Sequence, residues 1–235
     1  MTTKNYPLLE TRNLTKEYFR KDGSIIKALN GINLNVISGE FVAIVGRSGS
    51  GKTTLLNIVG ALDRPTYGEV ILEGKKLIDY SNRELALLRR QKIGFIFQTF
   101  NLLPTLTARE NIELALVHHQ ISQKQMNQKV EDLMDFLEIS DKMDSFPNEL
   151  SVGQQQKIAI ARALVKDPVL VLADEPTGEM DPIAEREIME LLFELNRKSK
   201  VTIIMASHGT FLFDFSDNML FIKNGKLVPK KEADY

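Results

Sequence analysis

The sequence contains no cysteine, which excludes both a disulfide framework and thiol chemistry. No apolar run approaches the roughly 18–20 residues that a membrane-spanning helix needs. The first residues, Met1 to Pro7, lack the apolar segment of a secretory signal. We therefore expect a soluble, cytoplasmic chain that acts at the inner face of a membrane only through partner proteins.

A surplus of charge of one sign is also missing. The chain has 30 Lys and Arg residues against 31 Asp and Glu residues, so its formal net charge is −1. Proteins that bind nucleic acid through a global basic field need a basic surplus, so we expect no nucleic-acid partner. A chain of 235 residues can bury a substantial core as one large domain or two small ones. Only one set of motifs is present, which favours a single domain over residues 1–235.

The most informative segment is the octet Gly46–Thr53, which fits G-x-x-x-x-G-K-[ST], the phosphate-binding loop of nucleoside triphosphatases. An apolar run at 41–45 predicts a buried strand before it, and residues 54–59 predict a helix after it. Glycines let the backbone wrap around phosphate oxygens, and Lys52 would contact the β- and γ-phosphates while Thr53 ligates Mg²⁺. The alternative is a glycine-rich turn with no ligand. The residues expected to contact ATP or GTP are Gly46, Arg47, Ser48, Gly49, Ser50, Gly51, Lys52, Thr53 and Thr54.

Strand patterns on both sides of a helical middle predict an α/β nucleotide-binding core with a helical insertion between its halves. Residues 105–166 have an almost wholly helical pattern, and 169–173 and 201–206 are apolar without alternation, as in parallel strands covered on both faces. The expected strands are 8–18, 28–37, 68–72, 75–78, 169–173 and 201–206. The expected helices are 122–137, 158–164 and 181–196, and a hairpin is expected to turn at Asn224-Gly225.

Two adjacent carboxylates, Asp174 and Glu175, close the predicted strand at 169–173. The carboxyl end of a parallel strand is where ligands bind in open α/β sheets. Asp174 is therefore expected to hold hydrated Mg²⁺ through water, and Glu175 to polarise an attacking water. A solvated acidic turn, aided by Pro176 and Gly178, is the alternative.

A third motif, Leu150–Gln154, precedes a predicted helix. Ser151 and Gln154 form an S-x-x-Q capping box, which by itself explains their presence. The functional interpretation uses the same physics, since a capped helix end beside Gly153 presents N–H groups to a phosphate.

The ordered motif set is Gly46–Thr53, Gln98, Leu150–Gln154, Asp174-Glu175 and His208. In this order the motifs resemble those of the nucleotide-binding subunit of an ATP-binding cassette (ABC) transporter, and the resemblance covers nearly the whole chain. Within that superfamily, residues 61–66, 89–98 and 100–104 resemble the macrolide-exporter and lipoprotein-release ATPases.

The resemblance implies an α/β fold with a P-loop NTPase (RecA-like) core. An N-terminal antiparallel β subdomain and an inserted α-helical subdomain accompany this core in the family. Residues 1–100 and 169–235 are then expected to form the core with its β subdomain. Residues from about 101 to 168 would form the helical subdomain that carries the signature segment Ser151–Gln154.

The resemblance also suggests roles for single residues. Tyr18 matches the aromatic residue that stacks on adenine, although its neighbour Phe19 shows that an aromatic strand residue here needs no ligand. Gln98 matches the glutamine whose side chain reaches the metal and whose following loop contacts the membrane subunit. His208 matches the histidine that touches the γ-phosphate, with a simply solvated histidine as the alternative. Asp181 matches the aspartate of a loop that crosses the dimer interface.

In this family two chains pack head to tail, and each ATP lies between the phosphate loop of one chain and the signature segment of the other. Ser151, Val152, Gly153 and Gln154 would thus contact the partner chain's ATP. Binding of two Mg-ATP closes the dimer, and hydrolysis releases it and drives separate membrane subunits of export or lipoprotein-extrusion type. The second chain is an identical copy or a paralogue.

Other functions remain open at this point. The same ATP-driven dimer could control transmembrane signalling or cell-wall remodelling without moving a substrate. A soluble ABC ATPase acting on DNA or ribosomes typically has a long coiled coil or two cassettes, and no sustained heptad pattern lies between Thr53 and Ser151. A simple NTP-dependent kinase would not need the motif at 151–154.

Three positions depart from the family's pattern. Val152 replaces the first of two signature glycines, and a β-branched residue resists positive φ and adds bulk beside a phosphate. Glu179 and Met180 stand where a small polar residue and Leu are usual, and Gly209 follows His208 where Asp is common. We expect these departures to affect turnover more than nucleotide binding.

Two clusters have ordinary explanations. His118 and His119 are adjacent and therefore point in different directions, so we interpret them as surface histidines and not as a metal site. Arg89, Arg90 and Lys92 could touch nucleic acid or lipid headgroups, but a short charged cluster is typical of a solvated face.

Overall fold

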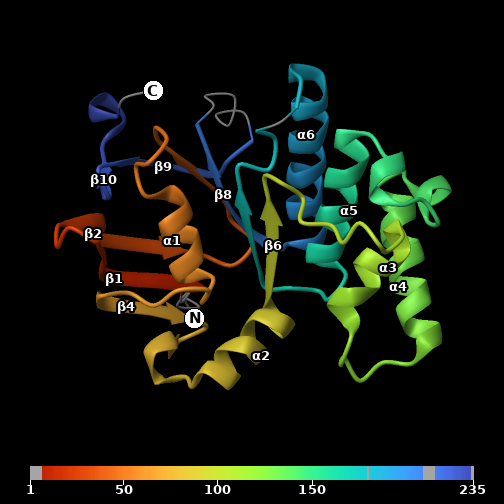
Figure 1. Ribbon diagram of the computed structural model, residues 1–235, viewed down its shortest axis with the longest axis horizontal. Helices are drawn as coiled ribbons and strands as arrows, with labels where there is room; N and C mark the ends of the chain where they lie inside the picture. The colour runs from red at the N-terminus through yellow and green to blue at the C-terminus, as the bar shows by residue number, and fades with distance from the viewer. Residues whose placement is uncertain (1–6, 179, 209–214, 234–235) are drawn as a thin grey trace, which may run out of the picture.

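The computed structural model describes residues 7–178, 180–208 and 215–233. Two sheets lie side by side, and a group of helices packs against the edge of the larger one (Figure 1). Within the described residues, no helix is long and apolar enough to cross a membrane. The arrangement is the predicted one: an α/β core, an antiparallel sheet and a helical insertion.

The smaller sheet is antiparallel and has the order β2-β1-β4-β5. Its strands are β1 (Leu9–Phe19), β2 (Ile25–Val36), β4 (Tyr67–Leu72) and β5 (Lys75–Lys76). The strand expected at 75–78 is wrong in its second half, because Leu77–Asp79 form a 3₁₀ turn. The turn buries Leu77 in the core and leaves Ile78 59% exposed.

The larger sheet has the order β10-β9-β3-β8-β7-β6. Its strands are β3 (Phe41–Val45), β6 (Ile93–Phe97), β7 (Leu170–Asp174), β8 (Thr202–Ser207), β9 (Asn218–Lys223) and β10 (Lys226–Val228). All of these pairings are parallel except β9 with β10. That pair is the predicted hairpin, and Asn224 and Gly225 both have positive φ in its turn.

The apolar strands lack alternation because both faces of the larger sheet are covered. Phe41, Ala43 and Val45 of β3 join a core shared with the helical insertion and α6 (Pro182–Ser199). Val42 and Ile44 point the other way, into a core shared with α1 (Lys52–Val59) and the antiparallel sheet. One five-residue strand thus connects two hydrophobic cores.

The insertion lies between β6 and β7 and contains α3 (Ala108–Glu113), α4 (Gln123–Phe136) and α5 (Val152–Leu164). α2 (Asn82–Lys92) precedes β6. The segment 105–166 is less helical than expected, since 3₁₀ turns and loops separate its α-helices. The capping box at Ser151 and Gln154 is confirmed, so α5 begins at Val152 and not at 158. Ser122 and Gln125 cap α4 in the same way, which explains why that amphipathic helix begins where predicted.

Close packing of β6 on α5 predicts a measurable cost for a single methyl group. A Cβ atom at Gly94 would lie 2.6 Å from the Ala163 carbonyl oxygen, which is a backbone atom of α5. We expect Gly94→Ala to lower the free energy of unfolding by about 1–3 kcal/mol, measured by urea denaturation. Gly153→Ala is the matched control, because a Cβ there meets no heavy atom within 4 Å. Equal stability of the two variants would contradict this packing.

Candidate active site

The phosphate loop joins the carboxyl end of β3 to the start of α1, and it needs glycine for two reasons. Gly51, the residue before α1, has φ 113, which L side chains rarely adopt, and its Cβ would lie 2.5 Å from the Ala28 carbonyl oxygen. A Cβ at Gly46 would lie 2.4 Å from the Ile222 carbonyl oxygen. The loop is thus held against β2 and β9, with the first N–H groups of α1 left for an external acceptor.

The Lys52 side chain lies at the centre of this loop and is only 4% exposed. Its Nζ donates to the carbonyl oxygens of Gly46 at 2.8 Å and Arg47 at 3.2 Å. The same ammonium forms an ion pair with Glu175 Oε1 at 3.3 Å. A nearly buried cation is therefore held where the loop surrounds it.

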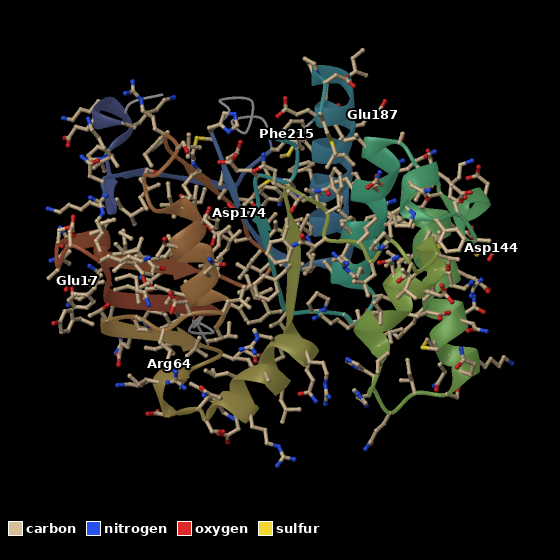
Figure 2. The ribbon with its side chains drawn as sticks, in the orientation of Figure 1. Glu17, Arg64, Asp144, Asp174, Glu187 and Phe215 are labelled. Atoms are coloured by element: carbon tan, nitrogen blue, oxygen red, sulfur yellow. The ribbon has the colours of Figure 1, made fainter. Side chains whose placement is uncertain are left out.

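Asp174 ends β7 beside α1, as Figure 2 shows. Burial raises the pKa of Asp174, and the neighbouring Glu175 charge raises it further, while the Thr53 hydroxyl and Lys52 act in the opposite direction. Asp174 Oδ1 is buried and has no hydrogen-bond partner among the described residues. An unpaired carboxylate oxygen beside a hydroxyl is a donor set that suits Mg²⁺.

Glu175 turns back over the loop because its backbone is left-handed, with φ 46. Its N–H donates to the Ala206 carbonyl of β8 at 2.9 Å, which fixes this turn. Its carboxylate then lies between Lys52 and His208, with His208 Nδ1 3.4 Å from Oε2. His208 follows β8 and its side chain is 64% exposed, so the group is accessible from outside.

Gln98 follows β6, the neighbour of β7, and packs on the turn after Glu175. A Cβ at Gly178 would lie 3.0 Å from Gln98 Nε2, which shows how closely the amide approaches that turn. The structure thus brings Gln98, Asp174, Glu175 and His208 together from the ends of β6, β7 and β8. Their roles in catalysis and metal binding stay predictions.

The loop after Gln98 is anchored to the insertion by residues that sequence reasoning missed. Phe100 and Asn101 both have positive φ, 55 and 50, and Arg162 of α5 donates to their carbonyl oxygens at 2.6 and 2.5 Å. Asn111 of α3 is fully buried and bonds to both the N–H and the carbonyl of Leu103. An arginine inside the apolar run 158–164 is the signal that could have identified the first anchor.

A cleft of about 370 Å³ lies over the loop. Its lining includes Ser48, Gly49, Gly51, Lys52, Thr53 and Thr54, all predicted to contact nucleotide. It also includes Ile26–Ala28 of β2 and the hairpin turn Asn224-Gly225, which the sequence did not suggest. The turn supports the loop, because the Gly225 N–H donates to the Ser50 carbonyl at 2.9 Å. A second cavity of about 570 Å³ is lined by Gly46, Arg47, Ser48, Glu175 and His208.

The predicted signature segment is separate from both cavities, since none of residues 151–154 lines them. Val152 is the first residue of α5 and does not have positive φ, so the expectation that its β-branch would strain the backbone here is wrong. Valine can adopt this helical backbone without strain. The bulk of its side chain, which is 42% exposed, is the part of the expectation that remains. Asp181 caps α6, accepting from the N–H groups of Ile183 and Ala184. Glu179 and Gly209 lie outside the described residues.

Two expectations about surface residues need correction. His118 is exposed, but His119 is only partly so, and its pKa is lowered by burial and by the nearby charges of Arg90 and Lys166. The basic cluster at 89–92 is also not simply solvated. Arg89 donates to the Ala61 carbonyl at 2.7 Å, and Arg90 Nε is buried. The end of α2 also contacts the insertion, because Lys166 Nζ donates to the Arg89 carbonyl at 3.0 Å.

Comparisons with known proteins agree with this geometry. Residues 29–178 match the family model described as ABC transporter. The uncharacterized ABC transporter ATP-binding protein YvcR of Bacillus subtilis is 43% identical over 93% of this chain and 85% of its own. The macrolide export ATP-binding/permease protein MacB of Nitrosomonas europaea is 40% identical over 97% of this chain, which spans 34% of MacB.

The similarity extends to solved structures. The dimeric structure of MJ0796, an ABC transporter cassette of Methanocaldococcus jannaschii, superposes with a TM-score of 0.86 at 41% identity. The match covers 94% of this chain and 97% of that one. A second structure of the same cassette, dimeric in a post-hydrolysis state, holds ADP and Pi and has the same TM-score of 0.86.

The raised pKa of Asp174 predicts a stability difference that depends on pH. Folding favours the protonated carboxyl, so its contribution to stability is present below the ordinary value of 3.8 and is lost as pH rises through the higher folded-state pKa. Asn resembles the protonated form. We therefore expect Asp174→Asn to raise the free energy of unfolding of ligand-free protein at pH 7, with a smaller gain near pH 4, measured by urea denaturation. Equal stabilities at pH 7 would contradict this electrostatic account.

Proposed function

The chain belongs to the ATP-binding proteins of ABC transporters, and we propose that it closes head to tail with a second cassette on two Mg-ATP to drive separate membrane subunits. As a member of this family it binds ATP and hydrolyses it to ADP and phosphate. MacB is an ATP-binding/permease protein for macrolide export, which supports an export or extrusion type of transport. The second cassette would be an identical chain or a paralogue.

One observation carries the two-chain proposal, namely the open space beside Gly153 at the start of α5. Gly153 lies inside this helix, where glycine is less favourable than alanine by about 0.5–1 kcal/mol. Among the described residues, no neighbour beyond its own helix explains the glycine, because an added Cβ would meet no such heavy atom within 4 Å. The segment is also separate from the cleft over the phosphate loop. The glycine leaves open space at the start of α5, and a ligand from another chain could fill that space. We propose that this ligand is the ATP bound to the phosphate loop of a partner chain.

The chain's own residues suit the binding half of the reaction. The N–H groups at the start of α1 and the Lys52 ammonium would bind the phosphates. The Thr53 hydroxyl, Asp174 through water and the Gln98 amide oxygen would hold Mg²⁺, consistent with the unpartnered Oδ1 of Asp174. When bound, the metal ion neutralises charge on the phosphate oxygens.

Glu175 suits the role of general base. Its carboxylate lies between Lys52 and His208, and the residue lines the cavity together with Gly46 and Arg47. A carboxylate so held would accept a proton from the attacking water. His208, which is exposed and already next to Glu175, would contact the γ-phosphate. Tyr18 would stack on the adenine base.

We further propose that membrane subunits contact the loop after Gln98. Leu103 in this loop is 47% exposed, while its backbone is bonded to Asn111. Arg162 ties the same loop to α5, the helix that begins with the signature segment. A push on this loop would therefore be transmitted to the surface that meets the second cassette. With such contacts, the chain would lie at the cytoplasmic face of the membrane.

Glu175→Gln tests the two-chain cycle. Removing the base should leave ATP binding intact and block hydrolysis, so the closed dimer accumulates. We expect Mg-ATP to shift the mass, measured by size exclusion with light scattering, to twice the 26.6 kDa of the monomer. A persistent monomer that still binds ATP would count against an identical partner and would favour a paralogue or a defective signature.

Gly153→Ala in the Glu175→Gln background tests the signature separately from folding. The methyl group points to open space, so the fold and ATP binding by the monomer should be unchanged. Dimer formation should weaken by about tenfold or more, because the methyl would meet the partner's nucleotide. The opposite change, Val152→Gly, should strengthen the dimer. Unaltered dimerisation in both variants, measured over a range of protein concentrations, would exclude this segment from the interface.

A further inference from the structure

Tyr18 carries a hydrogen bond that adenine stacking alone does not require. The residue lies on β1 opposite Ile26 of β2, which lines the cleft over the phosphate loop. Its side chain is 39% exposed, so one part of the ring remains accessible. Its hydroxyl donates to Asp63 Oδ2 at 3.0 Å and also bonds to the Thr54 hydroxyl of α1. A partly exposed aromatic ring is thus fixed at its far end.

The carboxylate that holds this hydroxyl is itself fixed. Asp63 Oδ1 accepts from Lys16 Nζ at 2.8 Å and from the Arg64 N–H at 2.7 Å. The Asp63 N–H donates to the Asn57 carbonyl of α1, which connects the residue to the helix of the phosphate loop. Burial opposes ionisation of Asp63, but the bonds from Lys16, Arg64 and Tyr18 outweigh it and lower its pKa. The acceptor is therefore charged at neutral pH.

Lys16 also limits which face of the ring a base can use. Its Nζ lies 5.0 Å from the centroid of the Tyr18 ring, a cation–π distance. The ammonium is held there by the Asp63 carboxylate and by the Arg64 carbonyl, at 2.8 Å in each case. One face of the ring is thus engaged by Lys16, and a planar ligand would approach the other.

We propose that Asp63 is a positioning residue that fixes the Tyr18 ring, together with Lys16, so that adenine meets it already oriented. The inference rests on the proposed function, in which Tyr18 stacks on the base of ATP. A tyrosine near the end of a strand loses rotamer freedom when it binds a ligand, and an anchor that removes this freedom beforehand increases affinity. Through Asn57 and Thr54, the anchor also sets the ring at a fixed position relative to the phosphate loop.

A purely structural role for this network predicts a different result. If the bonds only stabilised β1, their loss would lower the melting temperature and leave the affinity for bound nucleotide unchanged. Inorganic triphosphate separates the two roles, because it occupies the phosphate loop and has no base. Loss of Tyr18 positioning would lower the affinity for ATP and leave the affinity for triphosphate unchanged. Damage to the phosphate loop would lower both affinities.

The test measures ATP and triphosphate binding by calorimetry in the Glu175→Gln background, for Asp63→Ala, Tyr18→Phe, their combination, and Tyr18→Ala. Alanine is used at position 63 because asparagine could still form a hydrogen bond with the Tyr18 hydroxyl. Asp79→Ala is the control, since it removes an exposed carboxylate that forms none of the bonds described above. We expect Asp63→Ala and Tyr18→Phe each to weaken ATP binding by about three- to tenfold, the effect of one lost hydrogen bond, with triphosphate binding unchanged. The combination should bind ATP no more weakly than the weaker of the two single variants, because each single variant already removes the bond between Asp63 and the Tyr18 hydroxyl. Asp79→Ala should match the parent.

Three results would overturn the inference, and they separate it from the proposed function. If Tyr18→Ala leaves the affinity for ATP unchanged, Tyr18 does not stack on the base at all. Weaker ATP binding with Tyr18→Ala but not with Asp63→Ala or Tyr18→Phe would overturn the positioning role and leave stacking in place. Equal losses of affinity for ATP and triphosphate with Asp63→Ala would show that Asp63 acts on the phosphate loop.

Discussion

The site depends on the Lys52 ammonium, which is held almost out of contact with solvent. A buried cation is costly unless it is paired and hydrogen-bonded, and here the carbonyls of Gly46 and Arg47 and the carboxylate of Glu175 satisfy it. The glycines permit this arrangement, because side chains at Gly46 or Gly51 would collide with backbone oxygens of β9 and β2. The loop conformation, the Lys52 cation and the Glu175 carboxylate therefore support one another.

The strand order explains why that unit is found at one edge of the sheet. β3 lies beside β8, and β8 beside β7, so the phosphate loop, Glu175 and His208 follow adjacent parallel strands. β6 adds Gln98 from the next position. The helical insertion is tied to the same edge by Arg162, which bonds to two carbonyls in left-handed backbone after Gln98. The phosphate loop and the segment that we propose for membrane-subunit contact thus lie at the same edge of the sheet.

Much of this could be predicted from the sequence because its signals are local. The octet Gly46–Thr53, the unalternating apolar runs of β7 and β8, and the capping box at Ser151 each depend on neighbours within a few residues. The prediction of a strand at 75–78 was wrong for a local reason too, because the sequence pattern did not show that the chain turns at Leu77 and buries this residue in the core.

The missed features all depend on contacts between distant segments. Tyr18 reaches Asp63, the Gly225 turn reaches Ser50, and Arg162 reaches the loop after Gln98. Residue types alone do not report such pairings. At Val152 the sequence instead predicted a feature that is absent. The departure from the signature motif suggested a strained backbone, but Val152 begins α5 and has an ordinary helical conformation.

The central claim is that each ATP is shared between two chains, and mixing two inactive variants tests it most directly. Lys52→Met removes the charge of the phosphate loop, while Gly153→Asp places a negative charge in the open space at the start of α5. In a mixed dimer with a shared site, one site combines the intact loop of one chain with the intact signature of the other. The account predicts that an equimolar mixture recovers about a quarter of the wild-type ATPase rate, since half of randomly paired dimers carry one intact site. A mixture no more active than the two variants measured separately would contradict it.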